Sequence, residues 1–253
     1  MTHGPAAPHH VRVPVMRHRW ETLTFLHWPF DVNTVQRLLP SGLAVEPWEG
    51  RAWVALVPFH MRVRPPIGPA LPGVTTFPET NVRTYVTGPD GRPGVWFFSL
   101  DAANAPAVVA ARTLYGLPYF LARMKVERDG DTVTYRSHRI GPLRPRASHH
   151  IVVETGSPLS EEQLGPFEHY LTARFTLWAR HVGAILSSPA EHPPWTLREA
   201  RAVQLEQDLL RAAGLPDPSG EPLAHFAEGV DVRIGRPRII QRRSERRRAT
   251  GIS

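Results

Sequence analysis

The segment from Phe77 to Val86 constrains this chain more than any other, because polar and β-branched residues alternate along it. Side chains two positions apart on a β-strand point to the same face. One face of such a strand carries an acid, an amide, a guanidinium and a phenol: Glu79, Asn81, Arg83 and Tyr85. The other face carries residues suited to packing in a sheet: Thr80, Val82, Thr84 and Val86. The polar face fits either open solvent or an enclosed pocket, and that choice decides the function.

Length and composition indicate an ordinary globular protein. The chain has 253 residues, of which 42% are hydrophobic and 21% charged, and this length suits one large domain or two small ones. The sequence has no run of about 18 apolar residues, so we expect no membrane span. The first 14 residues lack the apolar core of a signal peptide, and we therefore expect a cytoplasmic protein without a membrane partner.

Several classes of chemistry have no sequence signature here. The chain has no cysteine, which excludes disulfides, thiolate metal sites and thiol nucleophiles. It has no HExxH motif or comparable ligand set, no phosphate-binding glycine motif and no GxSxG elbow. We therefore expect neither a metal nor an organic cofactor.

The net charge of +7 is concentrated at the C-terminal end, where residues 236–253 hold seven arginines and one glutamate. A basic tail of this kind binds polyanions weakly, but its composition favours a disordered, solvated segment. The sequence has no helix–turn–helix, zinc-finger or RNA-binding signature, so we expect no specific nucleic-acid partner.

Turn signals and apolar alternation predict many strands and few helices. Asp31, Asn104 and Ser160 are in position to cap short helices. Residues 197–213 fit a helix and a strand about equally well. This strand-rich order predicts an α+β fold with a large, mostly antiparallel sheet. The expected strands lie at 22–27, 51–60, 81–87, 94–100, 121–128, 132–140, 175–180, 184–188 and 230–240.

Four stretches follow the order of a known superfamily: residues 35–43, 77–79, 107–118 and 202–216. In them the chain resembles the acetoacetate decarboxylase-like superfamily. It is more closely similar to an uncharacterised bacterial branch, the domain of unknown function 2071 family. That likeness rests on the run from Glu79 to Val86 and on shorter motifs: His27-Trp28, Val57-Pro58-Phe59, residues 98–102, residues 117–119 and His192-Pro-Pro-Trp195.

The resemblance predicts the architecture and the domain limits. It implies one domain over residues 14–238, with a flexible N-terminus at 1–13 and a basic disordered tail at 239–253. It also implies a cone-like or barrel-like β-structure with short helices packed outside and a polar site inside. The polar face of the strand at Glu79 would then point into a cavity, and residues 199–213 would form a strand followed by a short helix.

The chain departs from the superfamily at the residues that perform covalent catalysis. In the decarboxylases, the proline that matches Pro118 is followed by two lysines, one of which forms a Schiff base with the keto acid. Here those positions hold Tyr119 and Phe120, which cannot condense with a ketone. The single lysine, Lys125, alternates with apolar residues on a charged strand face, and we do not expect it to replace the missing amine.

These observations predict a small-molecule-binding protein without a Schiff-base lysine. If it is an enzyme, we expect a lyase, isomerase or hydratase that acts on a small oxo or hydroxy acid. Glu79 is then the expected proton carrier, in acid/base chemistry at a carbon beside a carbonyl or in a hydration or dehydration step. Arg83 and Arg112 would hold an anionic organic ligand, and Tyr119 would donate a hydrogen bond. The resemblance implies that Glu79 and Arg112 match family residues. The remaining candidates for the pocket wall are Asn81, Tyr85, His27 and His60.

Two other hypotheses fit the same residues. A non-catalytic binding or sensing protein would use the same pocket without turnover. A structural protein would use a Glu–Arg network only to brace the sheet, with His27 and His60 as structural histidines. The sequence leaves open whether the chain forms a homo-oligomer.

Overall fold

The computed structural model describes residues 4–64, 75–142 and 145–242. Its helices are short: α1 (Val32–Gln36), α2 (Ala105–Tyr115), α3 (Pro166–Thr172), α4 (Leu209–Ala212) and the 3-10 turn η1 (Glu161–Gln163). The strands are β1 (Met16–Phe30), β2 (Ala44–Val45), β3 (Ala52–Arg64), β4 (Thr76–Thr87), β5 (Pro93–Ala102), β6 (Tyr119–Asp129), β7 (Thr132–Arg139), β8 (Ser148–Pro158), β9 (Thr176–His181), β10 (Ala184–Glu191), β11 (Leu197–Gln207), β12 (Leu223–Ile234) and β13 (Arg238–Arg242).

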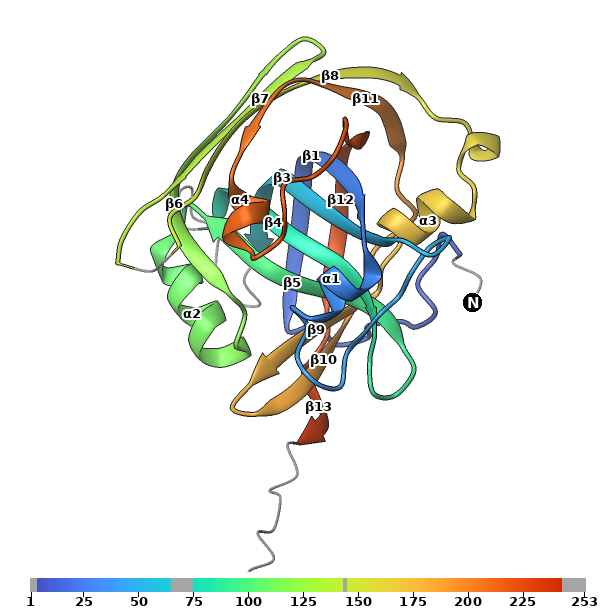
Figure 1. Cartoon of the computed structure of the whole chain (residues 1–253), viewed down its shortest axis with the longest axis vertical. Helices are drawn as coiled ribbons and strands as arrows, with labels where there is room; N and C mark the ends of the chain where they lie inside the picture. Colours follow the sequence, from blue (N-terminus) through green and yellow to red (C-terminus); the bar gives the residue numbers. More distant parts are fainter. Residues whose placement is uncertain (1–3, 65–74, 143–144, 243–253) are drawn as a thin grey trace, which may run out of the picture.

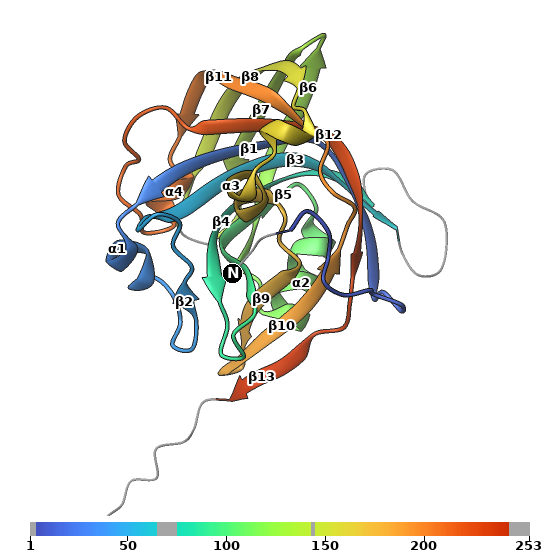
Figure 2. The same ribbon diagram turned by 90° about the vertical axis from the view of Figure 1, so that its right-hand side faces the viewer.

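All strands of the described residues belong to one sheet, in the order β13-β10-β9-β5-β6-β7-β8-β11-β12-β1-β3-β4-β2. Two additional pairings, β4 with β5 and β10 with β12, close this order into two circuits. The circuits share the wall β12-β1-β3-β4-β5 (Figures 1 and 2). Among the strands of these residues, β5 alone forms parallel pairs, with β6 and β9. The predicted α+β fold with a large, mostly antiparallel sheet is confirmed.

The shared wall is buried on both faces, because β3 is apolar at nearly every position. Val54 and Leu56 pack into the larger circuit, under the arch of β6, β7, β8 and β11 (Figure 1). Ala55, Val57 and Phe59 pack into the smaller circuit. Strands buried on both faces read as continuous apolar runs rather than alternating ones. The polar face of β4 is therefore enclosed, since it shares the side of Val57 and Phe59.

A bulge at Thr22 changes which residues of β1 face the smaller circuit. Thr22 has a φ of 51°, and the register of β1 with β3 shifts between Glu21 and Leu26. An extra residue in one strand reverses the alternation beyond it. His18 and Trp20 line the cavity before the bulge, and Leu23 and Phe25 line it afterwards.

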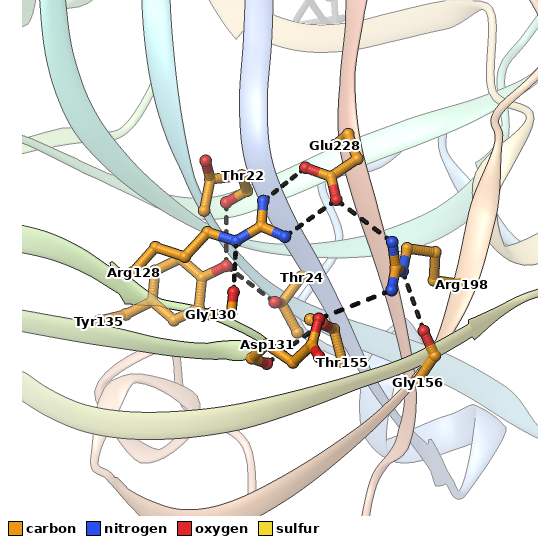
Figure 3. A network of polar contacts seen from close by, with 10 residues as sticks. All are labelled: Thr22, Thr24, Arg128, Gly130, Asp131, Tyr135, Thr155, Gly156, Arg198 and Glu228. Carbon is orange, nitrogen blue, oxygen red and sulfur yellow. Dashed lines mark hydrogen bonds and ion pairs between the residues drawn. The ribbon is translucent and has the colours of Figure 1, made fainter.

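Tyr135 of β7 holds this bulge from the opposite side of the wall. Its hydroxyl donates a hydrogen bond of 2.9 Å to the Thr22 carbonyl and lies 2.9 Å from Thr24 Oγ1. Figure 3 shows these contacts beside an ion-pair cluster in which Arg128 and Arg198 both contact Glu228. The cluster links β6, β11 and β12 at the rim of the larger circuit.

Helix α2 packs against β5, β6 and β9 (Figure 1). Asn104 caps its start by accepting a hydrogen bond from the Ala107 amide, as its sequence position predicts. Gly116, with a φ of 65°, ends it in the left-handed conformation that favours glycine. Within the described part of the chain, no helix has the length and apolar content to span a membrane.

The segment that fitted a helix and a strand equally well has one defined structure, and so do described residues near both ends of the chain. Residues 197–213 form β11 followed by α4, so the strand-then-helix expectation is confirmed. The basic tail was predicted to be disordered from residue 239 onward. Residues 239–242 instead belong to β13, which pairs with β10. The remainder of that tail lies outside the described residues. In the N-terminal segment, the Val11 amide donates to Glu191 Oε2 at 2.7 Å.

Candidate functional site

A cavity of about 300 Å³ lies against the face of the shared wall that points into the smaller circuit. Most of its wall is apolar, including Phe25, Val57, Phe59, Leu100 and Trp195. Small residues of α2 close one side. The polar side chains that line it are those of His18, Glu79, Asn81, Arg83, Tyr115, Tyr119, Thr172, Arg174, Ser188 and His192. The sequence predicted an internal polar cavity, whereas the structure shows a polar strip in an apolar one.

Glu79 is a buried carboxyl group with an unusual protonation state. Its residue is 2% exposed. Burial raises the pKa of Glu79 to about 8, with a smaller contribution from the charge of Asp101, and the hydrogen bond from Tyr119 acts against this rise. At neutral pH the folded protein therefore holds Glu79 mainly in its neutral form, which can donate a proton.

Tyr119 reaches Glu79 because of an uncommon strand pairing. Its hydroxyl donates to Glu79 Oε2 at 2.9 Å, although β4 and β6 are not neighbours in the sheet. The parallel pairing of Leu100 with Tyr119 places the start of β6 directly beside β5. Burial, and then the charge of Glu79, raise the pKa of Tyr119. Tyr119 therefore stays protonated and remains a donor.

Arg83 is a buried cation without a counter-ion. It is 6% exposed, and its Nη2 donates to the Leu171 carbonyl at 3.3 Å. Its Nε has no hydrogen-bond partner, and within the described ranges no carboxylate forms an ion pair with it. Its guanidinium lies 5.3 Å from the centre of the Phe25 ring. An uncompensated buried charge is costly, so this group is suited to bind an anionic ligand.

Arg174 lies on the same side of the cavity, but its charge is already balanced. Its Nη1 donates to Glu46 Oε2 at 2.6 Å and its Nε to the Tyr170 carbonyl at 2.6 Å. The guanidinium also lies 4.8 Å from the centre of the Tyr85 ring. Arg83 is therefore the stronger candidate for binding the ligand's charge.

Tyr85 and His27 lie behind the cavity wall rather than on it. The Tyr85 hydroxyl donates to the Leu171 carbonyl at 2.6 Å and lies 2.7 Å from His27 Nε2. Because that hydroxyl has one proton, His27 donates to it through Nε2–H. Burial lowers the pKa of His27 well below its usual value. The Tyr85–His27 pair supports the strand at Arg83. That Tyr85 or His27 binds the ligand directly stays a prediction.

The structure corrects the expected positions of Arg112 and His60. Arg112 is on the exposed side of α2, where its Nη1 donates to the Tyr119 carbonyl at 2.6 Å, because the small residues of the helix face the cavity. His60 alternates away from Phe59 and lies 3.9 Å from Glu21, with a side chain 31% exposed. Neither residue lines the cavity.

Sequence reasoning missed Arg174 and His192. Nothing in the local pattern around Arg174 distinguishes it from the other arginines of the chain. His192 belongs to the motif His192-Pro-Pro-Trp195, which carried the family resemblance and was the available signal. His192 packs against Trp195, with ring centres 5.1 Å apart, and burial lowers its pKa.

Lys125 does not line this cavity. The Lys125 side chain is 67% exposed and lies 2.7 Å from Glu127. The residues that the structure describes contain no group of three or more histidine, aspartate or glutamate side chains that could hold a metal ion.

Comparison with known proteins gives the evolutionary context of this cavity. Residues 17–231 match the model of the DUF2071 family, described as an uncharacterized conserved protein. The chain is 37% identical over 219 residues to the uncharacterized protein YqjF of Bacillus subtilis strain 168, a match that covers 86% of this chain and 89% of YqjF.

Solved structures share the fold at low sequence identity. An acetoacetate decarboxylase-like enzyme from Sphingomonas wittichii RW1 superposes with a TM-score of 0.62 at 13% identity, covering 90% of this chain and 94% of that one. The enduracididine biosynthesis enzyme MppR complexed with pyruvate gives 0.61 at 14% identity, covering 90% and 91%. The acetoacetate decarboxylase of Legionella pneumophila gives 0.59 at 14% identity, covering 92% of each chain. These similarities establish an acetoacetate decarboxylase-like fold.

Proposed function

This chain belongs to the DUF2071 family, and we propose that it binds a small organic acid in the cavity and that Glu79 exchanges a proton with it. The proposal places the ligand's charge at Arg83 and its carbonyl oxygen at Glu79 and Tyr119. The reaction class is Schiff-base-independent acid/base chemistry at a carbon beside the carbonyl, or hydration of that carbonyl.

The observation that carries this proposal is the Glu79–Tyr119 pair inside an apolar enclosure. A carboxyl group with a pKa of about 8 is matched to proton transfer near neutral pH. Structural ion pairs lower the pKa of an acid, whereas this environment raises it. Strong perturbation of an acid that lines a cavity is typical of functional sites.

The expected chemistry needs no group outside the chain other than water. In enolisation, the carbonyl oxygen takes the Glu79 proton while water accepts a proton from the adjacent carbon. The protonated water then returns a proton to Glu79, so no net proton is gained or lost. Tyr119 keeps its own proton and donates it in a hydrogen bond to Glu79 Oε2, so the proton of the neutral Glu79 carboxyl is the one that faces the ligand. Arg83 holds the carboxylate.

The proposal does not use a Schiff base, because the residues of the chain do not support one. The two positions after Pro118 hold Tyr119 and Phe120, and the one lysine is the exposed Lys125. Activated lysines are desolvated, and Lys125 is not.

The test combines binding with proton exchange. Oxo acids are screened for thermal stabilisation of the wild type, and those that bind are incubated in D₂O while NMR follows deuterium uptake beside the carbonyl. We expect uptake with the wild type and a loss of at least about a hundredfold in Glu79→Gln, the range of general acid catalysis. Equal uptake by both proteins would remove Glu79 from the reaction.

The two other hypotheses make different predictions in this test. Binding without deuterium uptake, and without exchange of the carbonyl oxygen with oxygen-18 water, would indicate a ligand-binding or sensing protein on the same scaffold. The structural hypothesis requires an ion pair between Glu79 and an arginine, but among the described residues the hydrogen-bond partner of Glu79 is Tyr119. We therefore do not favour a purely structural Glu–Arg network.

A further inference from the structure

The cavity has two polar seats, one formed by Glu79 with Tyr119 and the other by Arg83. They lie far apart along β4. Glu79 and Arg83 are four residues apart on β4, which pairs with β3 without a register shift across this stretch. Their Cα atoms are therefore separated by roughly 13 Å, at about 3.3 Å per residue.

The side chains do not bring the two groups into an ion pair, and the Arg83 guanidinium lies 5.3 Å from the centre of the Phe25 ring. The Arg83 guanidinium contacts the Leu171 carbonyl and lies 5.9 Å from the ring centre of Tyr85, and Tyr85 is two residues further along the strand from Glu79. Glu79 instead turns to Tyr119 of β6. No ion pair links Glu79 with Arg83 in the described part of the chain.

The wall between the seats is mostly apolar. Asn81 lies midway on the same face, and its register partners are Val57 of β3 and Leu100 of β5. All three line the cavity. Asn81 Oδ1 is buried without a hydrogen-bond partner, so one donor on the ligand can be accommodated there.

We propose that the ligand is an elongated oxo acid, whose carboxylate reaches Arg83 while its carbonyl oxygen reaches Glu79 and Tyr119 across an apolar spacer. This inference rests on the proposed function, since it takes the Glu79–Tyr119 pair as the seat of the carbonyl. A 2-oxo acid such as pyruvate has its carboxylate and carbonyl on adjacent carbons and can occupy only one seat. A spacer of about four or more carbon atoms is needed to approach both, given the strand spacing.

The charge arrangement supports the orientation. Arg83 is the uncompensated cation, whereas Arg174 is paired with Glu46. A neutral Glu79 repels a ligand carboxylate less than an ionised Glu79 does. It still offers no positive charge that would attract the carboxylate. The carboxylate therefore belongs at Arg83 and the carbonyl at the neutral Glu79 carboxyl, which Tyr119 holds in place through its hydrogen bond.

Calorimetric titration of the full chain tests this with a homologous series: pyruvate, 4-oxopentanoate, 6-oxoheptanoate and 8-oxononanoate, each beside its methyl ester. We expect 6-oxoheptanoate or 8-oxononanoate to bind at least about tenfold more tightly than pyruvate, and the acid more tightly than its ester by a similar factor. Arg83→Met should abolish the preference for acid over ester. Arg201→Met is the matched control, since Arg201 is 71% exposed and pairs with Glu154.

Three results would overturn the inference: pyruvate binding as tightly as the longer acids, no binding by any member of the series, or an unchanged acid preference in a folded Arg83→Met. The length and ester comparisons use the wild type, so they stand even if Arg83→Met does not fold. Tight binding of the long acids without deuterium uptake would refute the proposed proton transfer and support the inference about ligand shape.

Discussion

Tyr119 donates a hydrogen bond of 2.9 Å to Glu79 Oε2 from a strand that is not a neighbour of β4. The strand between them, β5, is parallel to β6 and antiparallel to β4. The pair therefore depends on the closure of the sheet and not on any local motif. It places a neutral acid and a neutral phenol side by side in an apolar cavity.

Glu79 should make the protein less stable as the pH rises. Its folded pKa is about 8 and its ordinary value is 4.5, so between these values the folded protein keeps a proton that the unfolded chain has released. The free energy of unfolding therefore falls across this window, by at most about 5 kcal/mol. Urea denaturation should show that Glu79→Gln gains stability relative to the wild type from pH 5 to pH 9. A constant difference between the two proteins would contradict the raised pKa.

Tyr119→Phe should raise the pKa of Glu79 further. The hydrogen bond from Tyr119 is the interaction that opposes the effect of burial, so its removal favours the neutral acid. NMR of carbon-13-labelled glutamate reports the titration directly. Tyr115→Phe is the control, because Tyr115 also lines the cavity without a hydrogen bond to Glu79. A lower Glu79 pKa in Tyr119→Phe would refute this assignment.

Tyr135→Phe should destabilise the β1 bulge by about 1 to 3 kcal/mol, because it leaves the Thr22 carbonyl and the Thr24 hydroxyl without this partner. Thr22→Gly should have the opposite sign, a gain of about 1 kcal/mol, because glycine relieves the strain of a φ of 51°. Denaturant unfolding at one pH measures both. A stabilised Tyr135→Phe would show that the contact does not hold the bulge.

Arg139→Met should destabilise the fold by about 3 to 5 kcal/mol, the cost of a buried charge that loses its partner. Arg139 and Asp101 are 2% and 0% exposed and lie 2.8 Å apart. The double variant Asp101→Asn/Arg139→Met should recover part of the loss, since no unpaired buried charge remains. Additive losses in the double-mutant cycle would argue against this coupling.

Asp101→Asn should also lower the pKa of Glu79, because the Asp101 charge raises it.

Part of the site was predictable from the sequence, because strand alternation is a local property. The run from Glu79 to Tyr85 is one strand with its polar side chains on one face, as the pattern predicts. Tyr119, which the sequence singled out because the resemblance implied a lysine at that position, also lines the cavity. Arg112 and His60 were misplaced because helix rotation and strand-end orientation depend on packing partners that are remote in the sequence. Arg174 and His192 were missed for the same reason.

The sequence by itself determined that β4 has one polar and one apolar face and that the two positions after Pro118 hold no lysine. It did not determine which space each face would enclose. Only the tertiary structure decided that, because the smaller circuit is closed by the pairing of β10 with β12, and β4 meets β5 to complete the wall. Alternation depends on neighbouring residues, whereas exclusion of water depends on strands that meet only after the whole chain has folded, and this exclusion turns Glu79 from a surface carboxylate into a buried acid.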